Sequence, residues 1–212
     1  MGLFQRKTQT GTEKPLYTLG LNRNLLIVGL GNPGAQHQDT RHNIGFNCID
    51  SLAKKLEFPE WVHKKDLKCM LTKQNVADTN VILMKPQTYM NLSGEAVQAV
   101  KNFYKVANNQ IIAVYDELDI PFGQIRTRLG GSSAGHGGVE SLIKHIGENF
   151  GRIRVGTHND LADKAEGKDF VLSKFNKEEQ EKLAALLREV NSILSEYIYG
   201  QPVTAETRSF LV

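Results

Sequence analysis

The stretch "NLLIVGLGNPG", residues 24–34, decides how the rest of this chain is interpreted. It is a short, continuous apolar run that ends in glycines, which is typical of a buried and often parallel β-strand. Its last six residues also fit the pattern G-x-G-x-x-G, the phosphate-binding fingerprint of dinucleotide-binding folds. The strand is therefore predicted at once, and the first question is whether the glycines after it hold a dinucleotide.

The residues that follow the glycines argue against a dinucleotide. A dinucleotide-binding loop opens directly into a helix, because the N-terminal amides of that helix bind the pyrophosphate. Here Gly34 is followed by the polar, unpatterned segment "AQHQDTR", and apolar periodicity begins only near Asn43. Asp50 has about the spacing of a ribose-binding acid but falls inside the next predicted helix. We therefore expect no organic cofactor, and a dehydrogenase stays as a minor alternative.

Strands and helices alternate on either side of this stretch. The periodicity predicts further strands at 80–86, 110–121 and 152–157, an edge or otherwise exposed strand at 124–131, and helices at 42–56, 91–105, 138–147 and 176–200. Asn91 or Ser93 is the expected N-cap of the second helix. The last helix begins with a capping box between Asn176 and Glu179 and ends at Gly200. This alternation predicts an α/β fold with a mostly parallel sheet.

Length and composition suggest one domain. A chain of 212 residues, 40% of them hydrophobic, can bury one sizeable core. We expect the domain to span residues 23–200, between a flexible N-terminal tail at 1–22 and a C-terminal tail at 201–212. No apolar run approaches the roughly 20 residues of a membrane span, and no secretory signal is evident.

Cysteine and histidine usage points to a cytoplasmic protein without a metal. Cys48 and Cys69 lie far apart and form no C-x-x-C, so neither a disulfide framework nor a cysteine-based zinc site is expected. The six histidines are scattered and show no metal-binding spacing.

The net charge of +3 is less informative than its distribution. The first 23 residues carry all of the excess, so any nucleic-acid surface on the rest of the chain must be a local patch. Such a patch is indicated between residues 123 and 156, where five basic residues face two acidic ones. Arg126 and Arg128 alternate there on one face of a predicted strand, a spacing that suits phosphates.

Polar groups gather where the predicted strands end. Asn32, Asn91 and Asp116 follow or close three strands, and His42 opens the first helix. Ligands of open α/β sheets bind outside the carboxyl ends of the strands, so these side chains can converge. A histidine beside a carboxylate suits a general base, and asparagine amides suit a carbonyl or an oxyanion. No serine is identified in a nucleophile elbow between a strand and a helix, and neither cysteine lies in a polar loop, so water is the expected nucleophile.

At this point the motifs resemble those of bacterial peptidyl-tRNA hydrolases. The matching segments are "IVGLGNPG", "TRHNIGF", "MKPQTYMNLSGEAV", "YDELDIPFGQIRTRLGGSSAGHGG", "GRIRVG" and "DFVLSKF", which occur in the family's order over about residues 24–198. The resemblance implies a single α/β domain with a twisted mixed sheet flanked by helices. It also implies hydrolysis of the ester between a peptide and the 3′ ribose of tRNA, without a metal or organic cofactor, by a monomer.

The resemblance also implies roles for residues. His42 is similar to the general base that activates water, and Asp116 to its partner. Asn32 is similar to the residue that distinguishes N-blocked from free aminoacyl-tRNA, and Asn91 to a binder of the peptide main chain and candidate oxyanion donor. Further expected substrate or tRNA contacts are Tyr89 and Met90 beside the reacting groups, and Arg126, Arg128, Arg154 and, less securely, Lys164 or Lys168 on the tRNA backbone.

Two positions depart from the family pattern. His37 stands in place of the usual tyrosine before "TRHN", and Gly137 stands where an asparagine is expected to contact substrate and help hold a water. We expect Gly137 to weaken substrate binding or alter water placement without abolishing the reaction, and introducing Asn there to raise kcat/KM. His136 is interpreted as structural rather than catalytic. The departures keep open a second interpretation, a catalytically weakened RNA-binding relative.

Overall fold

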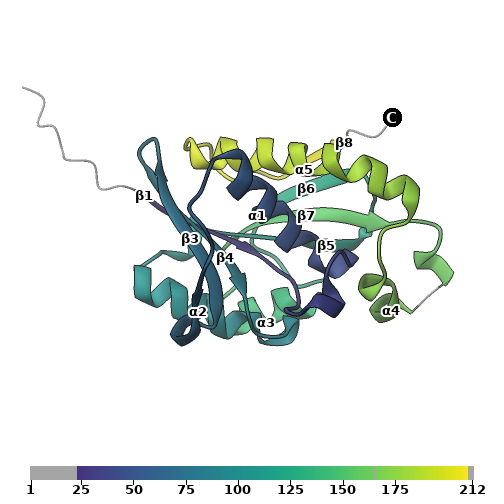
Figure 1. The fold of residues 1–212 in the computed structure, drawn as a ribbon, viewed down its shortest axis with the longest axis horizontal. Coiled ribbons are helices and arrows are strands. Elements are labelled where there is room, and N and C mark those ends of the chain that lie inside the picture. Colours follow the sequence, from purple (N-terminus) through teal and green to yellow (C-terminus); the bar gives the residue numbers. More distant parts are fainter. Residues whose placement is uncertain (1–22, 165, 210–212) are drawn as a thin grey trace, which may run out of the picture.

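A twisted mixed sheet forms the middle layer of the molecule, with helices on both faces (Figure 1). The structure is a computed structural model that describes residues 23–164 and 166–209. The strand order in this part of the chain is β2-β3-β4-β1-β5-β7-β6-β8. The strands are β1 Arg23–Gly29, β2 Val62–Lys64, β3 Cys69–Val76, β4 Thr79–Pro86, β5 Ile111–Pro121, β6 Gln124–Leu129, β7 Gly151–His158 and β8 Glu206–Ser209. The neighbours β4, β1, β5 and β7 run parallel, and the flanking strands are antiparallel, so the mixed, centrally parallel sheet of the expected α/β fold is confirmed.

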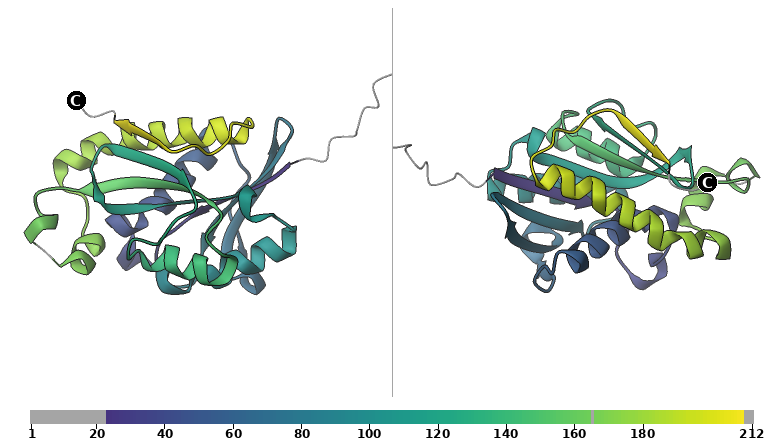
Figure 2. Two further views of the ribbon diagram at one scale, coloured as in Figure 1. Left: turned by 180° about the vertical axis from the view of Figure 1, so that it is seen from behind. Right: turned by 90° about the horizontal axis from the view of Figure 1, so that it is seen from above.

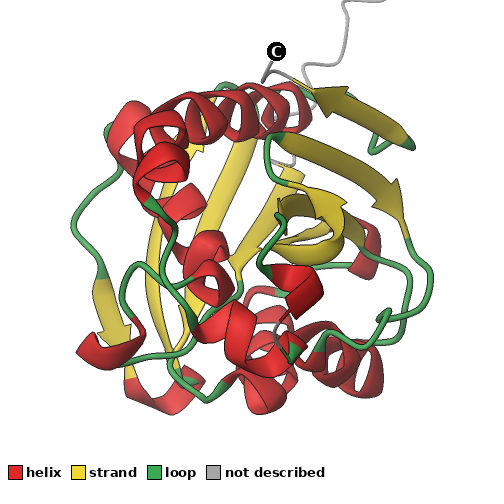
Figure 3. Ribbon diagram, turned by 90° about the vertical axis from the view of Figure 1, so that its right-hand side faces the viewer, coloured by secondary structure: helices red, strands yellow, loops and turns green. Residues whose placement is uncertain are grey.

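The helices form the two outer layers. Helices α1 Ile44–Lys55 and α5 Lys177–Ile198 cover one face of the sheet, and α2 Ser93–Tyr104 and α3 Gly137–Ile146 cover the other; α4 Gly167–Leu172 lies at one end (Figures 1 and 3). Seen from above, α5 runs along the sheet (Figure 2). The capping box of α5 forms as expected, and Gly200 follows its end with φ +100°.

The alternation within β1 explains why both faces are covered. Leu25 and Ile27 join the core cluster beneath α1 and α5, whereas Leu26 and Val28 join the cluster beneath α2 and α3. Successive side chains of a strand point to opposite faces, so a strand that is apolar throughout must be covered on both sides. The continuous apolar run at residues 24–30 is therefore the central strand of a three-layer fold.

The glycines of "GLGNPG" serve close packing more than turning. A Cβ on Gly29 would overlap the backbone oxygen of Gly45, and one on Gly45 would overlap backbone oxygens of Val114 and Leu30. Only Gly34 of this segment has a positive φ, +105°. The segment then passes through single 3-10 turns, η1 Ala35–His37 and η2 Arg41–Asn43, before α1 begins. No long helix starts at the glycines, so the geometry of a dinucleotide-binding loop is missing from this described segment.

The C-terminal end of the sheet differs from the prediction. Residues 206–209, expected to lie in a tail, form β8 and pair antiparallel with β6. As a result β6 lies between β7 and β8 and is not an edge strand, although its burial alternates as expected. Arg208 supplies the physical reason, because it contacts Glu196 and Glu189 of α5 and Glu206 of its own strand. These ion pairs attach a short polar strand that its hydrophobic pattern does not reveal.

The start of α2 is a second correction. The residue at the N-cap position is Leu92, and no side chain caps the helix, so neither Asn91 nor Ser93 is the cap. The 3-10 turn η4 Met90–Leu92 runs directly into the helix instead. The backbone N–H of Gly94 donates to Ser141 Oγ of α3 at 3.0 Å, which satisfies one amide of the first turn from outside the helix.

Strands β2 and β3 were not predicted. Their residues are interrupted by the 3-10 turn η3 Lys65–Leu67, and β3 is polar along its second half. The β3–β4 hairpin turns at Ala77 and Asp78, with Ala77 at φ +49°, a conformation that its sequence does not signal. The predicted N-terminal tail, residues 1–22, lies outside the described residues, and no described helix has the length and apolar character to cross a membrane.

Candidate active site

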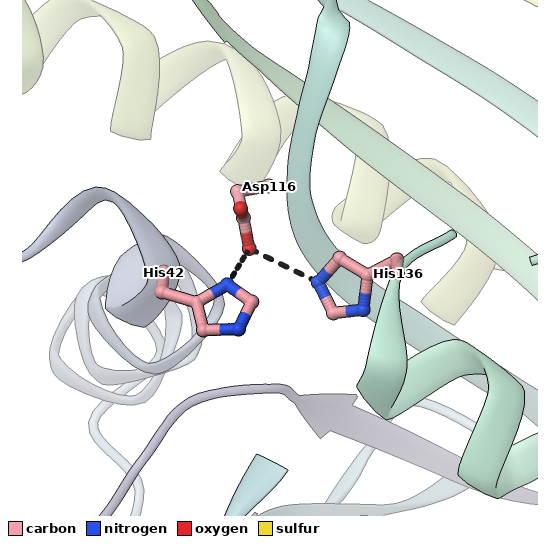
Figure 4. A group of neighbouring side chains, drawn as sticks. All are labelled: His42, Asp116 and His136. Atoms are coloured by element: carbon pink, nitrogen blue, oxygen red, sulfur yellow. Dashed lines mark hydrogen bonds and ion pairs between the residues drawn. The ribbon is translucent and has the colours of Figure 1, made fainter. Parts of the chain in front are cut away.

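His42 and Asp116 meet beside the carboxyl end of β1. His42 lies in η2, and Asp116 lies within β5; their Nδ1 and Oδ1 atoms are 2.9 Å apart (Figure 4). The Asp116 side chain is 2% exposed and that of His42 is 15% exposed. An ionised carboxylate can only accept, so His42 carries a proton on Nδ1, and in the neutral imidazole Nε2 is then the free acceptor. This is the arrangement of a general base with an orienting partner.

His136 approaches the same carboxylate oxygen from the other side (Figure 4). Its Nε2 lies 3.1 Å from Asp116 Oδ1, while its Nδ1 accepts the backbone N–H groups of Gly138 and Val139 at 3.2 and 3.3 Å. Because Nδ1 accepts, Nε2 must carry the proton and donate it to Asp116. Both ring nitrogens are thus engaged: His136 caps α3 and contacts the carboxylate of Asp116.

The two imidazoles determine the charge of Asp116. Burial alone would raise the pKa of this carboxyl, but its interactions with His136 and His42, each of which donates an N–H to it, outweigh burial and bring the pKa well below its ordinary value. Asp116 therefore remains a carboxylate at neutral pH and stays an acceptor for both histidines.

The same three side chains form a group whose spacing could suit a metal ion, with one ligand atom from each within 4.8 Å of the others. The sequence spacing did not show it, because the three residues come from separate segments. The hydrogen bonds of His136 disfavour a metal: its Nδ1 already accepts two amides, so coordination through Nε2 would require an imidazolate. The cluster fits a hydrogen-bonded catalytic group better than a metal site.

Asn32 is held so that its amide nitrogen is available. Its Oδ1 accepts the backbone N–H of Met90 at 2.8 Å, and its own backbone exchanges two hydrogen bonds with the side chain of Asn43, at 2.8 and 2.9 Å. These bonds fix which end of the carboxamide is oxygen. Among the described residues, no acceptor contacts Nδ2, which can therefore donate to a ligand. Met90 is itself buried in the core rather than lining the site, and it contributes through its backbone.

Asn91 reaches the start of α3. Its Oδ1 occupies the space in which a Cβ on Gly137 would lie, so the two segments touch beside His136. Glycine at position 137 thus gives the Asn91 carboxamide room that a side chain would take. An asparagine introduced at 137 would have to displace Asn91, and the predicted gain in kcat/KM from that substitution stays a prediction.

His37 and Tyr89 form a small aromatic pair from the loops after β1 and β4. Their rings are 6.5 Å apart and nearly perpendicular. Tyr89 is 62% exposed, which is unusual for a large aromatic side chain and leaves a ring face accessible. His37 therefore places an imidazole ring beside Tyr89, at the position where the family pattern has a tyrosine.

The predicted basic patch is a cluster on β6 and β7. Arg126 pairs across the strands with Arg154, and Arg128 with Arg152. Arg154 also lies 4.0 Å from Glu117. Burial and the neighbouring Arg128 lower the pKa of the Arg154 guanidinium. Half-buried like charges at this density are best satisfied by a bound anion.

Arg152 has another task within this cluster. It is fully buried, lies over the Phe150 ring at 4.7 Å, and donates to the backbone oxygens of Gly131 and Ser132. Arg128 also donates to Ser132 O, at 2.9 Å. These contacts hold the loop that leads to His136, so Arg152 serves the loop and not the surface. Lys168 lies exposed on α4; the side chain of Lys164 lies outside the described part of the chain.

Sequence reasoning missed three residues that hold the site. Asn43 fixes the Asn32 backbone, and Arg41 forms a buried ion pair with Glu179. Arg41 and Asn43 flank His42 within "TRHN", so the polar character of this motif at the start of a helix could have identified them. Glu179 was identified only as part of a capping box.

Comparisons with known proteins identify the family to which the sequence and the fold are similar. The family model for peptidyl-tRNA hydrolase matches residues 26–210. A peptidyl-tRNA hydrolase of Shouchella clausii is 45% identical over 73% of this chain and 82% of its own, and one of Fusobacterium nucleatum is 41% identical over 83% and 90%. A crystal structure of peptidyl-tRNA hydrolase from Acinetobacter baumannii, 34% identical, covers 85% of this chain and 91% of its own with a TM-score of 0.77.

Proposed function

The chain belongs to the peptidyl-tRNA hydrolase family, and on that premise we propose that His42 activates the water that cleaves peptidyl-tRNA in this enzyme. The observation that carries the proposal is the Asp116 carboxylate, whose Oδ1 accepts an N–H from each of two imidazoles. His136 has no ring nitrogen left to take a proton, whereas His42 retains Nε2.

The reaction follows from that difference. Nε2 of His42 takes a proton from water as the water oxygen attacks the carbonyl carbon of the ester. The resulting oxyanion needs a donor, and the Asn91 amide beside the start of α3 is our candidate. Collapse of the intermediate breaks the bond to the 3′ ribose oxygen, which receives the proton from His42. The products are a peptide with a free carboxylate and a tRNA with a free 3′ hydroxyl.

Asn32 would select the substrate. Its Nδ2 is fixed as a donor because Oδ1 is held by the Met90 N–H. A peptidyl group offers this donor a carbonyl oxygen, whereas a free aminoacyl group offers an ammonium, which is itself a donor. A buried donor facing another donor is unfavourable, so the site should reject free aminoacyl-tRNA.

The tRNA is proposed to lie on the arginines of β6 and β7, with Arg126, Arg128 and Arg154 near its phosphates and Lys164 or Lys168 farther along. Such contacts position the RNA without reading its sequence. We expect His37 and Tyr89 to contact the end of the tRNA that enters the site. The proposal includes a cytoplasmic monomer that needs neither a metal nor an organic cofactor, as the family resemblance implies.

The deciding experiment measures release of N-acetylated amino acid from N-acetyl-aminoacyl-tRNA. The wild-type chain should release it, and His42→Ala should lose at least about 100-fold in kcat, the lower end of what a general base contributes. His63→Ala is the matched control, because His63 is exposed on β2. Full activity in His42→Ala would refute the assignment, and tRNA binding without turnover by wild type would favour the weakened RNA-binding relative.

A further inference from the structure

Behind His42, the chain buries an ion pair that the proposed reaction does not use. Arg41, the residue before His42, is 1% exposed at its side chain, and Glu179 of α5 is 7% exposed. The two form a forked pair, with Nη1 to Oε1 at 3.0 Å and Nη2 to Oε2 at 2.6 Å. The guanidinium also lies over the rings of Phe170 and Phe175, at 4.4 and 4.8 Å. This geometry requires the planar fork of arginine.

Glu179 connects the pair to further segments. Its Oε1 also accepts from Asn159 Nδ2, just after β7, at 2.7 Å, and its Oε2 accepts the backbone N–H of Asn176 at 2.8 Å. Among the described residues, the Glu179 carboxylate thus accepts four hydrogen bonds, two at each oxygen. The capping box of α5 is therefore also an anchor between helix, strand and the turn that holds His42.

Arg41 fixes its own backbone as well. Its N–H donates to Ser173 O at 3.0 Å, and its Nη1 donates to Thr157 O at 3.3 Å. On the other side of His42, Asn43 holds the backbone of Asn32. The single turn η2 is thus fixed at both ends, with His42 between the two anchors.

We propose that Arg41 and Glu179 are positioning residues for hydrolysis: their buried ion pair fixes η2 so that His42 keeps its imidazole on Asp116. The inference rests on the proposed role of His42. A three-residue 3-10 turn has too few internal hydrogen bonds to hold a side chain in place by itself. A misplacement of about 1 Å can cost on the order of 100-fold in rate, so an external anchor has a catalytic consequence.

Stability alone is a weak reason for such a pair. Desolvation of two charges offsets much of their attraction, and an apolar replacement is often no less stable. An apolar contact has no preferred direction, whereas the two parallel hydrogen bonds between Arg41 and Glu179 fix the orientation of Arg41 and so of the backbone beside His42.

The experiment compares Arg41→Lys and Arg41→Met with Arg208→Lys and Arg208→Met in the full chain. Arg208 is the matched control, because it forms a forked pair with Glu196 of the same helix, at 3.0 and 2.8 Å, on the far strand β8. We expect both Arg41 variants to lose on the order of 10- to 100-fold in kcat with KM near the wild-type value, because substrate contacts remain. The Arg208 variants should keep both constants, even where their thermal midpoint falls.

A second readout isolates the route through His42. In a His42→Ala background, Arg41→Lys should cause little further loss in the residual rate, because residues that act through one group are not additive. Wild-type kcat in Arg41→Lys, or a further full loss in the double variant, would overturn the inference. If neither Arg41 variant folds, the pair serves the fold and the inference is likewise overturned. Full activity of His42→Ala would instead refute the proposed function itself.

Discussion

Asp116 is the residue on which the reactive geometry depends. Two histidines from separate segments donate to one of its oxygens, and each bond fixes a different ring. The identity of the base follows from what the second ring nitrogen of each histidine contacts, not from the distance of the ring to Asp116. His136 is saturated by the amides at the start of α3, and His42 is not. Both histidines contact the same carboxylate, but only His42 has a ring nitrogen that can accept a proton from water.

The lowered pKa of Asp116 predicts an acid-sensitive contribution to stability. The folded carboxyl binds its proton at lower pH than the unfolded one, whose pKa is about 3.9, so its stabilising effect is complete above that value. It is lost as the pH falls toward the folded pKa. Urea unfolding between about pH 5 and 3 should show a steeper fall for wild type than for Asp116→Asn. Equal slopes would show that Asp116 has no such shift.

Gly137 offers a second test at this scale. Gly137→Ala adds only the Cβ that overlaps Asn91, so we expect it to lower kcat/KM by displacing the candidate oxyanion donor. Gly137→Asn adds the same Cβ together with an amide, so it should be more active than Gly137→Ala. Steady-state hydrolysis by both variants separates the two effects. An Asn variant no better than the Ala variant would show that the added amide does not serve the substrate.

Among the elements, α1 contacts the sheet through backbone atoms. Gly45 in its first turn lies against Gly29 of β1 with no room for a Cβ on either, and this approach brings η2 and His42 to the sheet. The sequence shows the two glycines but not that they face each other. Backbone contact across two elements replaces the side-chain packing that usually separates a helix from a sheet.

Gly45→Ala should therefore destabilise the protein by about 1–3 kcal/mol, the usual cost of overpacking, despite the better helix propensity of alanine. Gly167→Ala is the control, because Gly167 is also helical but meets only the end of the Leu118 side chain, at 3.3 Å. Chemical denaturation measures both. Equal stability of the two variants would contradict the close-packing explanation.

At the scale of the whole molecule, arginines gather where β6 pairs with β7. Arginines on β6 and β7 face one another without enough acidic partners, while the other arginine pairs, Arg41–Glu179 and Arg208–Glu196, are matched. Cys48 and Cys69 are both buried and free, and burial raises the pKa of Cys69 to about 12. The arginines of β6 and β7 thus form an electropositive strand pair.

The tRNA affinity should therefore depend on salt and on this strand pair. Arg126→Gln and Arg154→Gln should each weaken tRNA binding and make the negative slope of log K against log salt shallower by about 0.9 per lost phosphate contact. Arg188→Gln, an exposed position on α5, is the control and should change neither. Filter binding over a range of salt concentrations measures the slopes. Unchanged slopes in the two β-strand variants would exclude these arginines from the RNA surface.

The sequence by itself determined the elements whose patterns are local: the apolar central strand, the amphipathic helices and the capping box of α5. It also supplied the candidate base and its partner, because their motifs are contiguous. Only the tertiary structure decided that His136 shares the carboxylate of Asp116, that Arg41 pairs with Glu179, and that the last residues add β8 to the sheet. These contacts join positions 20 to 138 residues apart. Their energies come from burial, charge pairing and hydrogen-bond direction, which the order of residues along the chain does not encode locally.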